Sequence, residues 1–233
     1  MLDAQGVEVT REAMGSIPDE VLAGNADPSA GHVHIRSFFR EPSHPLELEI
    51  GSGKGTFILD AARAKPDTNF LGIEWAGEFF RYAADRVRRA GVSNVRMYCG
   101  DAVEFIRWRC PSGVFRVIHL YFSDPWPKRK HWKNRVVQDR FLFDAHRVLC
   151  AHGEVRIVTD HEEYWAWMEE HFARWTAEGA PGFAGPGAPF ERSEFERAGS
   201  AADGELVGSN FERKYMLEGR PFHSAVLRKR GEQ

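Results

Sequence analysis

From residue 46 onward, short apolar runs alternate with longer segments in which apolar residues recur every three or four positions. This alternation predicts strands that are each followed by a helix, as in an α/β protein whose parallel sheet is covered by helices. We expect strands at Leu46–Ile50, Phe70–Glu74, Val95–Cys99, Val117–Phe122 and Val155–Val158. We expect helices at Thr56–Ala64, Gly77–Ala90, Val103–Trp108 and Val136–Leu149, and one capped by Asp160 that ends near Ala177.

The N-terminal region lacks this pattern. Residues 1–40 show weak periodicity, so we expect a loosely ordered arm that precedes a single domain at 41–233. The first residues carry no basic segment followed by an apolar run, and no apolar stretch is long enough to span a membrane. We therefore expect neither a secretory signal nor a membrane partner.

The C-terminal region contains a long irregular segment and two strand-like runs. Gly, Ala, Pro and charged residues dominate 179–208, which predicts a surface excursion with a short helix near Ser193–Arg197. The runs Arg213–Leu217 and His223–Leu227 are separated by turn-forming residues, which predicts a C-terminal antiparallel hairpin at the sheet edge.

Composition excludes several classes of protein. The three cysteines have no C-x-x-C spacing and the histidines are scattered, so we expect no disulfide framework and no metal site, and we favour the cytoplasm. The net charge is −3, with 31 basic against 34 acidic residues, so any affinity for nucleic acid must come from a local patch. The sequence leaves both a monomer and a homodimer open.

Carboxylates stand at the ends of the first four expected strands. They are Glu49, Glu74, Asp101 and Asp124. Because the carboxyl ends of parallel strands meet at one edge of a sheet, where ligands bind in such folds, we expect these four acids along one crevice.

The first strand runs into a glycine-rich loop, Gly51-Ser52-Gly53-Lys54-Gly55. The glycines allow tight turns and a close approach of the backbone to a ligand. The spacing fits neither a phosphate-binding loop, because Gly55 follows Lys54, nor a dinucleotide fingerprint, whose third glycine would stand where Thr56 does.

The acids around this loop favour a cationic ligand. Glu49, just before the loop, would repel a pyrophosphate but attract an ammonium or sulfonium group. Glu74 lies about 20 residues after the loop, the spacing at which an acid accepts ribose hydroxyls, and Asp101 could accept from the exocyclic amine of adenine. This set favours S-adenosylmethionine, while a dinucleotide or no cofactor remain open alternatives.

The segment Asp124–Arg135 combines a stiff turn with positive charge. Two prolines flank Trp126, and five cations follow within eight residues: Lys128, Arg129, Lys130, Lys133 and Arg135. Cations track phosphates and aromatic rings stack on bases, so the segment suits structured RNA. A merely solvated charged face, and a core position for Trp126, are the competing interpretations.

Six segments together resemble the bacterial tRNA (guanine-N(7))-methyltransferase family. They are Leu48–Gly55, Gly72–Glu74, Gly100–Ala102, Asp124–Lys128, Val158–Asp160 and Ser209–Arg213. The resemblance implies a Rossmann-like class I methyltransferase fold that uses S-adenosylmethionine to methylate N7 of a guanine in the variable loop of tRNA.

The resemblance also implies residue roles. The cofactor-site positions are Glu49, Gly51, Glu74, Asp101 and Asp124, and Asp124 matches the catalytic position. The substrate-binding positions are Lys128, Asp160, Ser209, Asn210, Phe211 and Glu212. The RNA-contacting positions lie in the basic loop and include Lys130, His131, Lys133 and Arg135. Ser209 stands where the family usually has Thr, and it keeps the hydroxyl.

Guanine N7 carries a free lone pair, so its methylation needs no general base. A carboxylate such as Asp124 can instead stabilise the positive charge that moves from sulfur to the base. Asp160 and Glu212 are acceptors that could read the donor edge of guanine, whereas Lys128 suits a carbonyl oxygen or a phosphate.

Three other functions remain open. They are an amino-methyltransferase that acts on adenine or cytosine, a catalytically silent RNA-binding module on the same fold, and a dehydrogenase. The Trp between the two prolines disfavours an amino-methyltransferase. The strand-end acids disfavour a catalytically silent module, and the glycine spacing disfavours a dehydrogenase.

Overall fold

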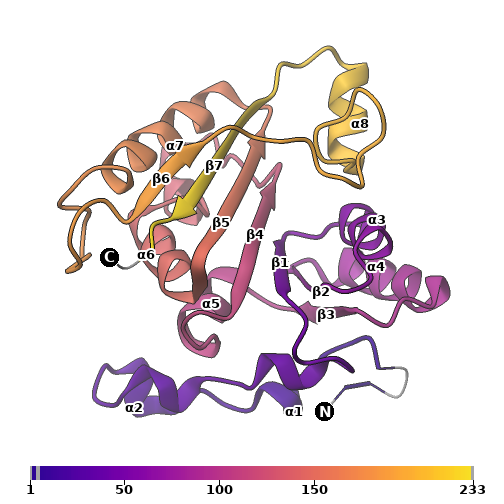
Figure 1. The fold of residues 1–233 in the computed structure, drawn as a ribbon, viewed down its shortest axis with the longest axis horizontal. Helices are drawn as coiled ribbons and strands as arrows, with labels where there is room; N and C mark the ends of the chain where they lie inside the picture. The colour runs from indigo at the N-terminus through magenta and orange to yellow at the C-terminus, as the bar shows by residue number, and fades with distance from the viewer. Residues whose placement is uncertain (1, 4–5, 232–233) are drawn as a thin grey trace.

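The computed structural model describes residues 2–3 and 6–231. Its centre is a seven-stranded sheet of order β3-β2-β1-β4-β5-β7-β6 (Figure 1). Strands β1 to β5 run parallel, and β7 lies antiparallel between β5 and β6. The strands are β1 (Leu46–Ile50), β2 (Asn69–Glu74), β3 (Val95–Cys99), β4 (Phe115–Tyr121), β5 (Leu149–Thr159), β6 (Phe190–Ser193) and β7 (His223–Lys229). The predicted α/β class with a mostly parallel sheet is confirmed.

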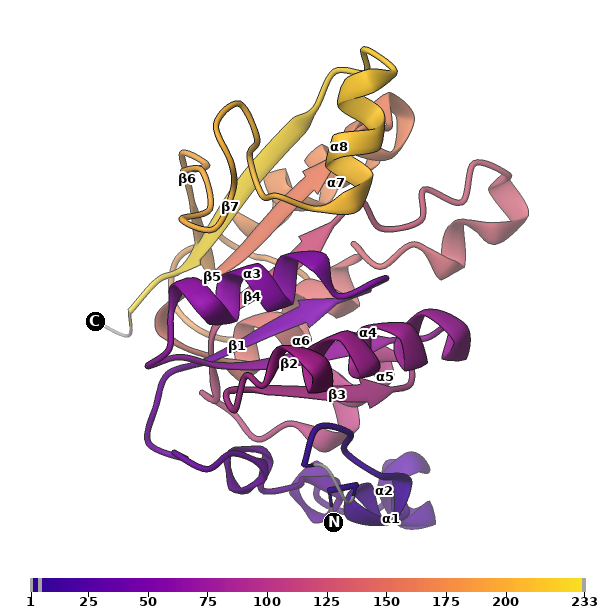
Figure 2. The ribbon, with the colours of Figure 1, turned by 90° about the vertical axis from the view of Figure 1, so that its right-hand side faces the viewer.

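Helices cover both faces of the sheet (Figure 2). The α-helices are α1 (Arg11–Met14), α2 (Asp19–Leu22), α3 (Thr56–Ala64), α4 (Gly77–Ala90), α5 (Ala102–Arg109), α6 (Asp139–Val148), α7 (Glu162–Trp175) and α8 (Asn210–Leu217), and the 3-10 turns are η1 (Pro28–Gly31), η2 (Ile35–Phe38) and η3 (Arg129–Asn134). Helices α3 and α4 share one hydrophobic core with the sheet, and α5, α6 and α7 share the other.

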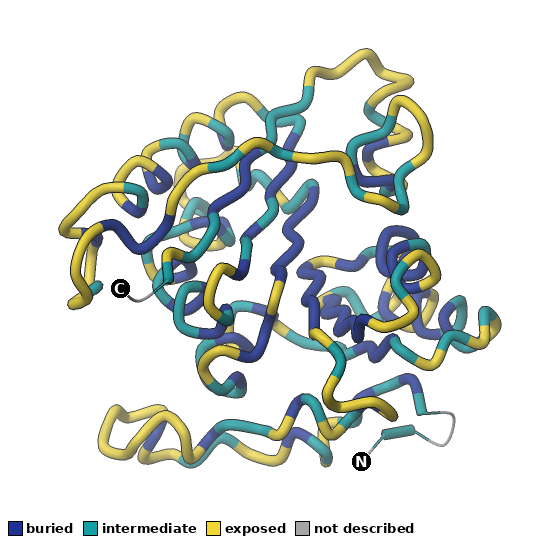
Figure 3. Tube along the Cα trace, viewed as in Figure 1, coloured by how far each residue is buried: buried dark blue, intermediate teal, exposed yellow. Residues whose placement is uncertain are grey.

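Local sequence explains the helices nearest the first strands. In α4, Phe80, Ala83, Ala84 and Val87 are buried at helical spacing, and the helix ends at Gly91, whose φ of 68° a residue with a side chain rarely adopts. Strands β1 and β2 are buried along their whole length (Figure 3), as central strands of a two-sided parallel sheet should be. The expected bounds of β1, β3, α3 and α4 are confirmed to the residue.

The helix expected to be capped by Asp160 is capped one residue later, and it is α7 (Glu162–Trp175). His161 is its N-cap and accepts a hydrogen bond from the Tyr164 amide. Asp160 does not cap because its carboxylate instead forms an ion pair with Arg220, with N and O 2.6 Å apart.

The expected C-terminal hairpin does not form, because the first of its two expected strands is a helix. Residues Arg213–Leu217 lie in α8, because the Ser209 hydroxyl caps that helix by accepting from the Glu212 amide. The neighbour of β7 at the sheet edge is β6, which lies in the segment expected to be a surface excursion. The short helix expected near Ser193–Arg197 is absent from these described residues, since Ser193 ends β6 and irregular backbone follows.

The N-terminal segment packs more closely than expected. Val9, Met14, Ile35 and Phe39 are buried in the larger core, and Glu8 forms a bridge to Met97 at the edge of β3. Residues 1, 4 and 5 of the expected arm lie outside the described residues. The division into an arm at 1–40 and a domain at 41–233 stays a prediction.

Candidate functional site

The parallel register brings the strand-end acids to one edge of the sheet, which we call the rim. Glu49 pairs with Gly72 on β2, and Glu74 pairs with Cys99 on β3. Asp101 follows β3 and Asp124 follows β4, so all four acids lie at the carboxyl ends of four neighbouring strands. The structure therefore brings together the residues that the sequence predicted to share a crevice.

Glu74 organises the glycine loop at the centre of the rim. Its two carboxylate oxygens accept hydrogen bonds from the Gly53 amide, at 2.7 Å, and from the Ala76 amide, at 2.8 Å. Gly55 has a φ of 69°, and a Cβ there would come within 2.9 Å of the Ala83 side chain. The loop thus needs glycine both for its turn and for its contact with α4. Each oxygen of Glu74 keeps a lone pair for a further donor.

Glu49 is a buried acid with unused hydrogen-bonding capacity. Its side chain is 5% exposed, and its Oε2 atom makes no hydrogen bond within the described part of the chain. Burial, together with the negative charge of Glu74, raises the pKa of the Glu49 carboxyl to about 8. Buried polar atoms normally have partners, so this oxygen fits a ligand that brings a donor or a positive charge.

Asp101 serves first as a helix cap. Its Oδ1 atom accepts from the amides of Val103 and Glu104, at 2.8 and 3.0 Å, and so begins α5. The side chain is exposed at the rim, and both of these bonds use the same oxygen. The capping role is therefore compatible with a ligand contact through Oδ2.

Asp124 projects from a strained turn. Phe122 and Trp126, on either side of it, have φ values of 54° and 43°, which residues other than glycine rarely adopt. Phe122 is held between the rings of Tyr215 and Phe222, with centroids 5.7 and 5.3 Å away. Such strain is concentrated at functional sites. Asp124 itself is exposed.

The basic loop after Asp124 presents most of its cations to solvent. Lys128, Arg129, Lys130 and Lys133 are exposed, while His131 is half-buried against Trp126 at a ring distance of 5.7 Å. These four cations lie within six consecutive residues and form a local positive surface on a protein whose net charge is negative.

Arg135, expected to contact RNA, is instead buried. Its guanidinium donates to the Pro125 carbonyl at 2.8 Å, pairs with Glu163 at 3.1 Å, and lies over the rings of Trp132 and Trp167. The side chain is 1% exposed. These contacts fasten the Asp124 turn to α7, which corrects the expected RNA-contacting role to a positioning one.

Glu212, expected to read guanine, is also turned inward. It is fully buried, and its carboxylate accepts from the amides of Leu206, Val207 and Gly208. An acid that neutralises three backbone donors holds the loop before α8, and it has no exposed oxygen for a base. This corrects the role expected for Glu212.

The other residues of the predicted substrate segment face outward. Asn210 and Phe211 are exposed, and Phe211 stacks on Tyr215 at 5.9 Å. The Phe211 ring lies 3.8 Å from the position that a Cβ would take on Gly53, so α8 reaches across to the glycine loop. By contrast, the Asp160 side chain is only 11% exposed and forms an ion pair with Arg220.

Sequence reasoning missed a buried polar network beneath the rim. Glu47 accepts from the side chains of His119, Arg116 and Lys65, at 2.9, 2.6 and 3.2 Å. Burial raises the pKa of Glu47, but the hydrogen bond and charge of His119, the charge of Lys65 and the hydrogen bond from Arg116 outweigh it and hold the pKa far below its usual range. The signal in the sequence is the alternation Glu47-Leu48-Glu49, which places both acids on one face of β1.

The described residues contain no helix long and apolar enough to cross a bilayer, and no group of three or more acidic, His or Cys side chains that could hold a metal ion.

Comparison with known proteins places this site in a family. A family model described as a putative methyltransferase matches residues 43–178, which contain all four rim acids and the basic loop. A crystal structure of an aminoglycoside resistance methyltransferase superposes with a TM-score of 0.51 and 16% identity, covering 83% of this chain and 89% of that one, which shows the fold alone.

Two curated relatives have the same name, tRNA (guanine-N(7)-)-methyltransferase. One, from Rhodopseudomonas palustris, is 35% identical over 168 residues, which are 70% of this chain and 63% of the relative. The other, from Bradyrhizobium diazoefficiens, is 35% identical over 170 residues, which are 71% of this chain and 70% of the relative. The matched region thus spans about two thirds of the length of these relatives. Together with the family model, the identity over this length shows that the chain belongs to the tRNA (guanine-N(7)-)-methyltransferase family.

Proposed function

We propose that this protein transfers the methyl group of S-adenosylmethionine to N7 of a guanine in the variable loop of tRNA. The observation that carries the proposal is the strained Asp124 turn, which joins the rim acids to an exposed cationic loop. The names of the relatives support the same substrate.

The rim fits the cofactor by the chemistry of its donors and acceptors. The remaining lone pairs of Glu74 suit ribose hydroxyls, and the exposed Asp101 suits the adenine amine. The unpartnered oxygen of Glu49 suits a cationic group. Gly51, with a φ of 74°, keeps the backbone open for close approach. S-adenosylmethionine supplies the methyl group, bound to a sulfonium that makes it transferable.

Asp124 is the catalytic residue in this proposal. Guanine N7 attacks with its own lone pair, so the protein removes no proton from it. As the methyl group moves, positive charge moves from the donor to the imidazole ring of the base. An exposed carboxylate beside that ring stabilises the charge, and alignment of the reactants supplies most of the remaining acceleration.

The tRNA would be held by residues on both sides of Asp124. Lys128, Lys130, Lys133 and His131 lie on the basic loop, where cations suit phosphates. Ser209, Asn210 and Phe211 lie at the start of α8, and Asp160 becomes an acceptor for guanine once Arg220 releases it. Arg135 and Glu212 position these two segments.

The test is methyl transfer from labelled cofactor to bulk tRNA, followed by strand scission specific for N7-methylguanine. The wild-type protein should give scission in the variable loop. Asp124→Ala should keep its melting temperature and lose turnover by about 100-fold or more, as expected when a charge-stabilising group is removed. Asp203→Ala, which removes an exposed acid far along the chain, is the matched control.

Two results would count against the proposal. Methylation of tRNA on an exocyclic amine, detected by nucleoside mass spectrometry, would favour the amino-methyltransferase alternative. Near-wild-type turnover by Asp124→Ala would remove this carboxylate from the mechanism.

A further inference from the structure

A groove outside the rim runs between helices α3 and α4. It is open to solvent, has a volume of about 350 Å³ and is lined by Leu59, Arg63, Tyr82, Arg86, Arg89 and Ala90. It contains none of the strand-end acids, no residue of the basic loop and no residue of α8, so neither the cofactor site nor the proposed catalytic turn accounts for it.

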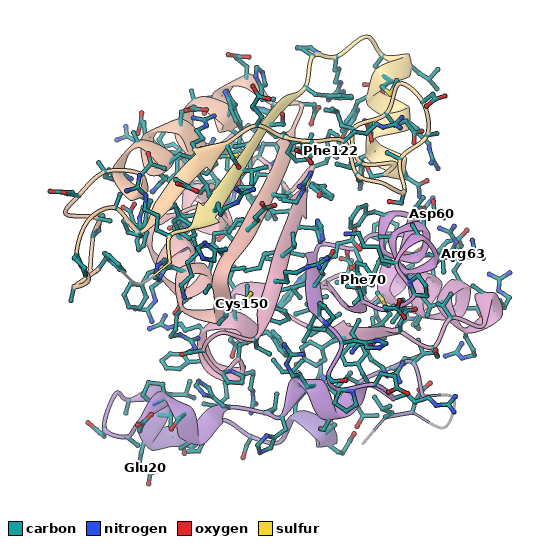
Figure 4. The ribbon with its side chains drawn as sticks, viewed as in Figure 1. Glu20, Asp60, Arg63, Phe70, Phe122 and Cys150 are labelled. Carbon is teal, nitrogen blue, oxygen red and sulfur yellow. The ribbon has the colours of Figure 1, made fainter. Side chains whose placement is uncertain are left out.

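The groove carries concentrated positive charge. Three of its six lining residues are arginines, and none of these described lining residues is acidic. Arg63 and Arg89 are 56% and 67% exposed. Their carboxylate partners, Asp60 at 3.9 Å and Asp85 at 2.8 Å, are not among the residues that line the groove. Exposed pairs of this kind contribute little, so they leave both arginines free to exchange partners. Asp60 and Arg63 project from the outer side of α3 (Figure 4).

One of the three arginines is fixed in place. Arg86 donates to the Lys54 carbonyl at 2.9 Å and to the Thr56 hydroxyl at 2.8 Å, which ties α4 to the start of α3. Neither partner is charged, so the positive charge of Arg86 remains unneutralised by them. A held cation needs no further ordering when an anion binds, which favours binding.

Exposed aromatic rings share the arginine-bearing face of α4. Phe79 and Tyr82 are 42% and 50% exposed. With Arg86 and Arg89 they recur at spacings of three and four residues, which places all four on one stripe of the helix. The Lys54 ammonium lies 5.9 Å above the Tyr82 ring. Large exposed rings beside arginines suit stacking on nucleic-acid bases more than they suit a solvated surface.

The stripe starts close to the proposed catalytic edge. Helix α4 begins three residues after Glu74 and runs away from the rim. At 1.5 Å per residue, the stripe extends from Phe79, about 3 Å along the helix, to Arg89, about 18 Å along it. Figure 2 shows α4 and the loop that contains η3 on opposite sides of the rim. A polynucleotide whose base reaches Asp124 can therefore lie against both.

We propose that the groove between α3 and α4 is a second tRNA contact, which binds backbone phosphates of the substrate outside its methylated loop. The proposal rests on the function proposed above for the substrate class. Arg63, Arg86 and Arg89 bind phosphate oxygens, and Tyr82 contacts an adjacent unpaired base or sugar. The groove adds affinity and sets the orientation of the tRNA, without touching the reacting atoms.

The test compares binding with turnover in the double variant Arg63→Ala/Arg89→Ala. Its tRNA dissociation constant should rise about tenfold at moderate salt. The slope of log affinity against log salt should become shallower by about 1.5, because each lost phosphate contact accounts for about 0.7 to 0.9. S-adenosylmethionine affinity, and kcat at saturating tRNA, should stay at the wild-type values, so that only KM for tRNA rises.

Two control variants distinguish tRNA binding by Arg63 and Arg89 from a general effect of positive charge or of protein stability. Arg192→Ala/Arg228→Ala removes two exposed, ion-paired arginines at the opposite edge of the sheet, and it should leave tRNA affinity within twofold of wild type. Arg63→Lys/Arg89→Lys keeps the charge, and it should restore the salt slope. Melting temperatures of all variants check that they fold.

The proposal would be overturned if Arg63→Ala/Arg89→Ala bound tRNA with the same affinity and the same salt slope as the Arg192→Ala/Arg228→Ala control. The same result with altered sedimentation would also overturn it, and would assign the groove to contact with a second copy of the chain. If wild type binds tRNA through the groove but forms no N7-methylguanine, the proposed function fails while this inference stands.

Discussion

At the scale of single residues, burial decides what an acid can do. Glu49 and Asp101 both stand at strand ends, but Glu49 is enclosed at the rim while Asp101 caps a helix in solvent. Burial raises the pKa of the Glu49 carboxyl to about 8, because it disfavours the charged form. The same chemical group therefore has different surroundings at two positions of one crevice.

This difference gives a prediction for Glu49→Gln. The pKa of Glu49 rises from 4.5 to about 8 on folding, so the native state holds this proton more tightly than the unfolded chain does. Its contribution to stability is therefore fully present below pH 4.5 and is lost as the pH rises toward 8. Gln cannot ionise, so at pH 8.5 the variant should be more stable than wild type by up to roughly 4 to 5 kcal/mol, at about 1.4 kcal/mol per pKa unit.

Urea unfolding at pH 4.5, 6.5 and 8.5 measures this effect. Glu20→Gln, which neutralises an exposed acid on α2, is the control and should parallel wild type at every pH. A Glu49→Gln curve that also parallels wild type would show that the carboxyl is not desolvated.

The rim acids could be located from the sequence because each lies near or just after the end of a run that has the length of a buried strand. The role of Arg135 could not be predicted from the sequence. In sequence it is the last of five cations, but in the fold it is enclosed by Trp132 and by Trp167 of α7. A contact across 32 positions of the chain leaves no trace in the local charge pattern.

At the scale of elements, α8 shows how a short segment is misassigned. Arg213–Leu217 has no pattern long enough to separate strand from helix. The segment Ser209-Asn210-Phe211-Glu212 nevertheless carries a helix-start signal, Ser followed three residues later by Glu. In the structure Ser209 does cap the helix, but Glu212 turns back to the loop amides at 206–208. The signal for the helix was local, whereas the role of Glu212 depends on the preceding loop.

Removing the Glu212 carboxylate should therefore loosen that loop. Glu212→Ala leaves the amides of Leu206, Val207 and Gly208 without acceptors, and each buried unpaired donor costs about 1 to 3 kcal/mol. We expect a loss of at least about 3 kcal/mol in the free energy of unfolding, set by that same cost per donor. Urea unfolding measures the loss, and hydrogen exchange locates it at 206–208.

Glu218→Ala serves as the control, because Glu218 lies at the exposed end of the same helix, where its ion pairs with Lys214 and Arg220 lie at the surface. It should change stability by no more than about 0.5 kcal/mol, as is usual for surface positions. Slow exchange at 206–208 in Glu212→Ala would mean that these amides find other acceptors.

At the scale of the whole molecule, the parallel half of the sheet could be predicted and the antiparallel edge could not. Strands β1 to β4 alternate with helices, so the chain order itself limits the topology. Strand β6 has four residues, only one of which is buried, and pairs with β7 across a long connection. The N-terminal segment was similarly hidden, because its buried residues come from separate short turns and share no period.

The central claim is that the rim acids form a site for S-adenosylmethionine, and calorimetric titration of that molecule into the protein tests it most directly. We predict one site per chain. Asp101→Asn keeps the helix cap, because Asn caps as well as Asp, but it can turn an amide donor toward the adenine amine. It should weaken binding about tenfold, as an unpaired donor in a site costs 1 to 3 kcal/mol. The absence of any saturable heat with the wild-type protein would contradict the claim.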